Sequence, residues 1–209
     1  MTVQPAPSTD EIPSAEPGGR TLPRALAHRG LITDPRILGI VAGVLVTATT
    51  VAFVVTGVAR SIGPSQYRLA TGLSTPTFVA AIVGFLCWFS RCRTNAEAYA
   101  PGTHRHSPGF AIGAWFIPVA MWWIPRRVTL DIWRATGLGN AWLVNVWWAT
   151  WIGRMVVGIV TPQLDPHHIN PYALPVETAY VLSGVTAVLL IHRITRAQSA
   201  IYQADRARS

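Results

Sequence analysis

A run of 23 residues without a charged side chain, from Ile37 to Ala59, restricts the fold more than any other feature. A helix rises about 1.5 Å per residue, so this run crosses a hydrocarbon core of about 30 Å with some tilt. Asp34 and Pro35 precede it and are typical of a helix start, because the carboxylate caps free N–H groups and proline lacks one. The run therefore predicts a first membrane-spanning helix over residues 37–59.

Three further apolar runs have the composition of spanning helices, at residues 77–93, 141–160 and 174–192. Charged residues make up 12% of the chain, whereas soluble domains carry roughly 25%. The sequence thus predicts an all-α fold, a polytopic membrane helical bundle that occupies residues 34–195.

The segment from 108 to 136 is also apolar, but prolines interrupt it. On a continuous helix four of its residues fall within one arc of about 80°, namely Trp115, Pro118, Trp122 and Pro125. Proline frees backbone carbonyls, which need partners in lipid, so this broken-helix face is expected to lie against protein or near the interface. The alternative is an ordinary proline-kinked helix with tryptophans at the membrane boundary.

The positions of the arginines distinguish two topologies. If residues 109–124 cross the membrane, the chain has five spans and one strongly basic end lies outside. If they form a re-entrant or interfacial segment, there are four spans, both termini are cytoplasmic, and 14 of the 17 arginines lie inside. The positive-inside rule favours four spans, and a stretch of about 16 residues is short for a crossing. Five spans remain the alternative.

The two ends of the chain differ in composition from the bundle. Residues 1–33 are rich in proline, serine, glycine and alanine without apolar periodicity, which predicts a disordered cytoplasmic tail. Residues 196–209 predict a basic cytoplasmic C-terminal tail. The expected location is the cell membrane, with a multi-pass topology.

Arg154 interrupts the third predicted span. A charge at the bilayer centre costs about 2.5–3.5 kcal/mol, so this arginine should face protein or water and have a partner. Glu177, near the start of the next span, lies at a similar depth. The sequence predicts an intramembrane polar pair of Arg154 and Glu177. The pair would serve either as an ion, proton or anionic-headgroup site or as a structural contact.

A second polar group is expected at the cytoplasmic interface. Residues 126–135 have the pattern of an amphipathic helix, which would lie in the membrane surface or pack on its neighbours. With polar residues after the second span, they would form a collar around the mouth of the broken segment. The predicted members are Arg91, Arg93, Asn95, Asp131, Arg127 and Arg134.

No motif for nucleophilic catalysis, phosphate binding or metal hydrolysis is present in the sequence. The nearby pairs Cys87 and Cys92, His104 and His106, and His167 and His168 lack the further ligands of a metal site. The arginines cluster at the ends of apolar runs, which indicates a membrane surface rather than nucleic acid. We therefore expect no enzyme activity, no cofactor, no metal and no nucleic-acid partner.

The order of short motifs between Trp88 and Trp133 resembles that of a known family. The motifs are Arg91-x-Arg93-x-Asn95-Ala96, Ser107-Pro108-Gly109, Trp115-Phe116-Ile117-Pro118, Pro125 and Ile132-Trp133-Arg134, followed by Trp147, Trp148 and Trp151. They are similar to the "domain of unknown function 4328" family of bacterial membrane proteins, frequent in actinobacteria. The resemblance covers about residues 37–195. It implies a multi-pass membrane protein without an assigned activity.

These features together predict an integral membrane module that binds a lipid or a partner protein through the broken segment. The expected partners are anionic lipid headgroups at the cytoplasmic face, and a protein partner or a second copy of the chain. The alternative is a small transporter or channel-like subunit that uses the broken helix and the intramembrane Arg154.

Overall fold

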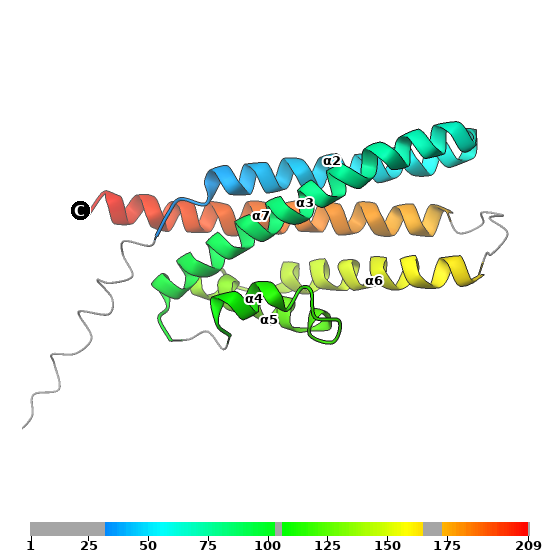
Figure 1. Cartoon of the computed structure of the whole chain (residues 1–209). Coiled ribbons are helices and arrows are strands. Elements are labelled where there is room, and N and C mark those ends of the chain that lie inside the picture. The colour runs from blue at the N-terminus through cyan, green and yellow to red at the C-terminus, as the bar shows by residue number, and fades with distance from the viewer. Residues whose placement is uncertain (1–31, 103–105, 165–172, 209) are drawn as a thin grey trace, which may run out of the picture.

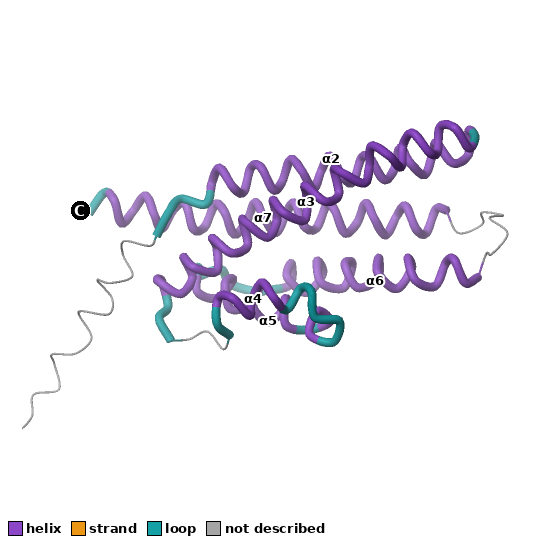
Figure 2. Tube along the Cα trace, viewed as in Figure 1, coloured by secondary structure: helices purple, strands orange, loops and turns teal. Residues whose placement is uncertain are grey.

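The computed structural model describes residues 32–102, 106–164 and 173–208. Most of the predicted N-terminal tail lies outside these residues, as do His104, His167 and His168. The described residues form helices and connecting loops and contain no strand (Figure 2).

Four long helices carry the apolar runs. They are α2 (Arg36–Ile62), α3 (Pro64–Tyr99), α6 (Trp142–Leu164) and α7 (Ala173–Arg206). Within the described part of the chain, four helices are long and apolar enough to cross a membrane. This finding confirms the predicted all-α polytopic bundle with four candidate spans.

The helices alternate in direction, and α7 packs between α2 and α6 (Figure 1). The start of the described chain and the C-terminus lie at the same end of the bundle (Figure 1). We call it the terminal end, and the opposite end, where α2 turns into α3, the far end. Helix α3 packs on α2 and diverges from α6 toward the far end (Figure 1).

Helix α3 begins at Pro64, well before the expected start near residue 77, and contains Pro76 in its interior. Pro76 has no N–H for the helical hydrogen bond, but nearby hydroxyls satisfy carbonyls around it. The Thr77 hydroxyl, for example, donates to the Ser74 carbonyl at 2.7 Å. Because the serines and threonines bond to their own helix, most of the stretch between the first two predicted spans is helical, and Gly63 alone joins α2 to α3.

Small residues bring α2 and α7 close together at three levels along the bundle. At each level a Cβ added to a glycine would overlap a side chain of the facing helix. In lipid, where burial from water does not drive association, such close packing stabilises helix pairs. The three contacts are Gly39 with Thr195, Gly184 with Thr50, and Gly57 with Glu177.

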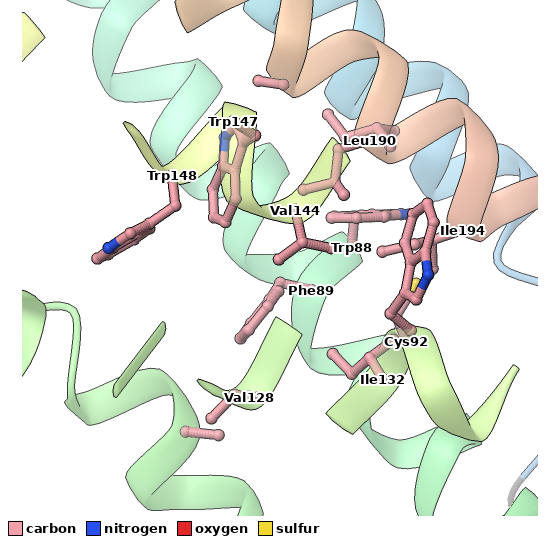
Figure 3. Close-up of a cluster of buried hydrophobic side chains, with 14 of the residues drawn as sticks. Trp88, Phe89, Cys92, Val128, Ile132, Val144, Trp147, Trp148, Leu190 and Ile194 are labelled. Carbon is pink, nitrogen blue, oxygen red and sulfur yellow. The ribbon is translucent and has the colours of Figure 1, made fainter. Parts of the chain in front are cut away.

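The hydrophobic core lies in the terminal half of the bundle, where side chains from several helices converge (Figure 3). Trp88 of α3 is 1% exposed, and its indole nitrogen donates to the Thr195 hydroxyl of α7 at 2.9 Å. Its neighbours in the core include Phe89, Cys92, Ile132, Val144, Trp147, Leu190 and Ile194. These contacts fix α3 and α6 against α7 at the terminal end.

The broken segment folds into three short elements, α4 (Pro108–Gly113), the 3-10 turn η1 (Ala120–Trp122) and α5 (Ile124–Ala135). Its longest helix has 12 residues, about 18 Å, which is too short to cross a bilayer. Helices α4 and α5 contact each other and α3, and they stay beside the terminal half of α6 (Figure 1). The structure therefore agrees with the re-entrant or interfacial arrangement, and it gives no support for a fifth span.

Candidate functional site

The prolines of the broken segment start new short helices and do not kink one long helix. Pro108 and Pro125 each stand in the first turn of a helix, where the missing N–H leaves no gap in the hydrogen bonding. The chain turns between α4 and α5, so the predicted common face is not formed. Pro118 and Trp122 are exposed, and Pro125 is buried. Trp115 lies against aromatic rings of α3 and α6.

Trp115 holds the segment between α3 and α6 through aromatic contacts. Its ring lies 5.4 Å from Phe85 and 5.9 Å from Phe89, both on α3, and 5.8 Å from Trp151 on α6, all edge to face. Trp147 lies 6.3 Å away. Such pairs contribute about 0.5–1.5 kcal/mol each beyond the area they bury.

The tip of the segment exposes apolar side chains. Phe116 is 67% exposed and Val119 64%, and Ile117, Trp122 and Trp123 are also exposed. A soluble protein rarely presents such a cluster, whereas lipid solvates it. The tip thus has the surface expected of a segment that enters the membrane.

Next to Trp115 a cavity of about 490 Å³ lies among the four long helices. Its wall is mainly aromatic and aliphatic, with Phe85, Trp147 and Trp151 among the rings. The exceptions are a few polar side chains contributed by α2, α6 and α7. They are Thr49, Thr50, Arg154, Tyr180 and Ser183.

Among the described residues that line this cavity, Arg154 is the one that is charged. Its guanidinium carbon lies 5.1 Å from the centre of the Tyr180 ring, which is a cation–π contact. The Glu177 carboxylate instead packs over Gly57 of α2. Among the described residues no ion pair joins Arg154 to Glu177, so the predicted intramembrane pair is not formed directly.

The predicted polar collar is divided into separate networks at the terminal end. Arg93 is 2% exposed and donates to the Glu97 carboxylate at 2.9 Å and to the His106 carbonyl at 2.7 Å. The second of these bonds ties the end of α3 to His106, two residues before the broken segment. A buried arginine bound in this way helps to position the segment.

Asn95 belongs to a second network that links three distant parts of the chain. Its amide nitrogen donates to the Thr33 carbonyl at 2.9 Å and to Gln198 Oε1 at 3.1 Å. The Gln198 amide nitrogen donates to the Cys92 carbonyl at 3.0 Å. Asn95 and Gln198 are both fully buried, and the two bonds of Gln198, with Asn95 and with the Cys92 carbonyl, form away from water.

The residues expected to begin a C-terminal tail continue α7 without a break to Arg206. Ser199 is 2% exposed, and its hydroxyl donates to Asp34 Oδ1 at 2.6 Å. This stretch is therefore part of the bundle, because buried polar bonds fasten it to the start of α2. Sequence reasoning missed Gln198 and Ser199, since nothing local distinguishes them from the polar residues of a solvated tail.

The remaining collar residues lie on the surface. Arg134 and Asp131 form a loose pair at 3.7 Å, and the Arg134 side chain is 70% exposed. Arg127 is exposed, and Arg91 reaches the Thr33 hydroxyl at 3.4 Å. The apolar stripe of α5 is buried in the core, so of the two arrangements expected for 126–135 the structure forms the packed one.

Among the described residues, no three His, Cys, Asp or Glu side chains gather closely enough to hold a metal ion.

A family model described as "Domain of unknown function (DUF4328)" matches residues 55–199. No curated protein and no solved structure matches the chain. The matched range contains α3, the broken segment, α6 and α7 as far as the buried Ser199, and it covers more than half of the chain. The protein belongs to the DUF4328 family.

Proposed function

We propose that this protein is an integral membrane module that binds an anionic amphiphile in the cavity among its four long helices. By anionic amphiphile we mean a lipid-like molecule with one acidic group and an apolar chain. The observation that carries this proposal is the single cation, Arg154, in an otherwise largely apolar cavity of about 490 Å³. Cavities of about 300–1,000 Å³ with few polar groups are typical ligand sites.

The charge of Arg154 supports an acidic ligand. Arg154 stands 12 residues after the start of α6, about 18 Å along the helix, close to the middle of a bilayer. A charge there costs about 2.5–3.5 kcal/mol, and one cation–π contact returns about 0.5–2 kcal/mol. An anion within the cavity would offset the remainder.

We expect the ligand to enter the cavity laterally, from the lipid bilayer. Helices α3 and α6 diverge toward the far end, and two lining residues, Phe116 and Ile82, are 67% and 38% exposed (Figure 1). An amphiphile would enter between these helices, with its acidic group reaching Arg154 and its chain lying on the aromatic wall. The exposed tip of the broken segment would flank the entrance.

Arginine positions support a cytoplasmic terminal end in the cell membrane. Ten arginines of the described chain belong to this end, whereas Arg60 and Arg68 are near the far end. The positive-inside rule assigns the arginine-rich side to the cytoplasm. A membrane-impermeant thiol reagent added outside should label a cysteine at Ser61 and spare one at Arg208. Labelling of the second position alone would reverse this orientation.

The proposed binding can be tested by quenching of tryptophan fluorescence, because Trp115, Trp147 and Trp151 line the cavity. The purified protein is titrated in neutral detergent with a dibrominated fatty acid and with its uncharged methyl ester. We expect the acid to quench at lower concentration than the ester. Replacing Arg154 with Gln should weaken binding of the acid about tenfold or more and leave the ester unchanged.

Arg60→Gln is the matched control. Arg60 also stacks on a tyrosine, 5.0 Å from the centre of the Tyr67 ring, but it is exposed and does not line the cavity. The control should bind the acid as the unmodified protein does. Equal quenching by acid and ester, or an Arg154→Gln protein that retains the preference, would exclude the proposed site.

The second candidate is a small transporter or channel-like subunit. The broken segment beside a central cavity favours it, since transporters place their sites at interrupted helices. Flux of a labelled fatty acid across proteoliposomes that is lost in Arg154→Gln would favour this function. Binding without flux would favour the module. Neither candidate function includes a catalytic step.

A further inference from the structure

A separate groove lies between α2 and α7 in the terminal half of the bundle, with a volume of about 890 Å³. All of its lining residues belong to these two helices, so it shares no residue with the cavity around Arg154. Gly43 stands in its wall, and a Cβ added there would meet no atom within 4 Å. The missing side chain leaves an open channel along α2.

The end of the groove nearest the termini is cationic. Arg36 and Arg196 line it, both are exposed, and none of the described lining residues is acidic. Asp34, just before α2, is held by other groups: its Oδ1 accepts bonds from the Ser199 hydroxyl at 2.6 Å and the Arg36 backbone N–H at 3.0 Å. Among the described residues neither Arg36 nor Arg196 forms an ion pair.

Toward the far end the groove becomes apolar. Ile40 is 60% exposed and Val44 61%, and Ala48 and Val188 continue the wall. From Arg36 to Thr47 the helix rises about 16 Å, close to half of a hydrocarbon core of about 30 Å. The groove therefore extends over the depth of one leaflet, with its cations at the headgroup level.

We propose that this groove holds one anionic glycerophospholipid from the leaflet at the terminal end. Its phosphate lies between Arg36 and Arg196, and one acyl chain follows the channel at Gly43. The two ends of such a lipid match the cationic and apolar ends of the groove in order and in length.

A second copy of the chain fits the groove less well. Two copies in one membrane share their orientation, so a two-fold axis along the membrane normal would bring residues of equal depth together. Arg36 and Arg196 would then face the same arginines of the other copy, and like charges in contact oppose association. The charge pattern accordingly favours an anion over a symmetric dimer.

The groove is tested by native mass spectrometry of the purified protein in neutral detergent with added phosphatidylglycerol or phosphatidylcholine. We expect one tightly held phosphatidylglycerol and weaker phosphatidylcholine binding. Arg36→Gln combined with Arg196→Gln should weaken phosphatidylglycerol binding about thirtyfold, the usual effect of two arginines near an anionic headgroup. Arg127→Gln combined with Arg193→Gln removes the same charge from exposed residues of the terminal end outside the groove, and should leave binding unchanged.

Gly43→Leu tests the apolar part of the site without altering its charge. A Cβ at this position meets no atom within 4 Å, so we expect the variant to fold, with its side chain in the channel, and to lose the bound lipid. Gly72→Leu, which also meets no atom within 4 Å of its Cβ, is the control. The proposal is overturned if both lipids bind equally, if the double arginine variant keeps its lipid, or if Gly43→Leu instead removes a dimer. Arg154→Gln should leave this lipid in place, which separates the groove from the internal cavity.

Discussion

Gln198→Leu is the most direct test of how the bundle is held together at its terminal end. Gln198 is fully buried, accepts a hydrogen bond from Asn95 at 3.1 Å and donates one to the Cys92 carbonyl at 3.0 Å. Leucine has a similar volume, so the substitution removes the polar contacts and creates little cavity. The effect on stability should therefore come from hydrogen bonding.

The expected loss can be worked out bond by bond. Each of the two hydrogen bonds contributes about 1 kcal/mol, and one N–H of Asn95 would be left buried without an acceptor, which costs about 1–3 kcal/mol. The second N–H of Asn95 keeps the Thr33 carbonyl at 2.9 Å. We expect a loss of about 3–5 kcal/mol in the free energy of unfolding. For a chain of this size this lowers the unfolding midpoint by roughly 6–20 °C.

The measurement is thermal unfolding in detergent, followed by tryptophan fluorescence, since Trp88 and Trp147 lie in the adjacent core. Gln203→Leu is the matched control, because Gln203 is exposed on the same helix, and it should change stability by less than about 0.5 kcal/mol. Adding Asn95→Val to Gln198→Leu should cost less than the sum of the two single changes, because it removes the orphaned N–H. The reasoning is refuted if Gln198→Leu matches its control or if the two changes are additive.

Three other predictions use the same assay. Trp115→Ala should lower stability by about 3–5 kcal/mol because its ring contacts both α3 and α6, whereas Trp122→Ala, at an exposed position, should change it little. Gly184→Leu should cost about 1–3 kcal/mol because the new side chain would overlap Thr50 of α2, while Gly153→Leu, with open space around its Cβ, should be tolerated. Removal of residues 197–209 should destabilise the protein more than Gln198→Leu does, because it deletes Gln198 and Ser199 together with their hydrogen bonds. Removal of residues 207–209 leaves both residues in place and should change stability little.

The four long helices could be predicted from the sequence because the membrane imposes a simple rule of length and low charge. The same rule misplaced the start of α3, since Ser, Thr and Pro residues near Pro76 are typical of a loop in water. In the structure their hydroxyls bond to helical carbonyls. The re-entrant or interfacial character of the broken segment was predictable from the positions of the arginines and from its short length, but its turn was not. Prolines at the first turn of a helix and prolines within a helix look alike until the caps are known.

The Arg154–Glu177 pair was predicted from the similar depth of the two residues, and depth does not determine the direction in which a side chain points. The two residues lie at similar heights, yet the Glu177 side chain packs over Gly57 of α2. Arg154 instead meets Tyr180, three residues further along α7. The contact of Asn95 with Gln198, 103 residues apart, has no local signal in the sequence at all.

The hydrogen bonds that join Thr33, Asn95 and Gln198 also bear on the order of biogenesis. The α2–α3 hairpin turns at a single residue, so it can assemble as soon as the ribosome has released both helices. Asn95 and Asp34 find their partners on α7, which is synthesised after the hairpin, the broken segment and α6. The bundle thus closes only once α7 has emerged, and until then the nascent hairpin depends on the insertion machinery or on water at the membrane surface to satisfy those groups.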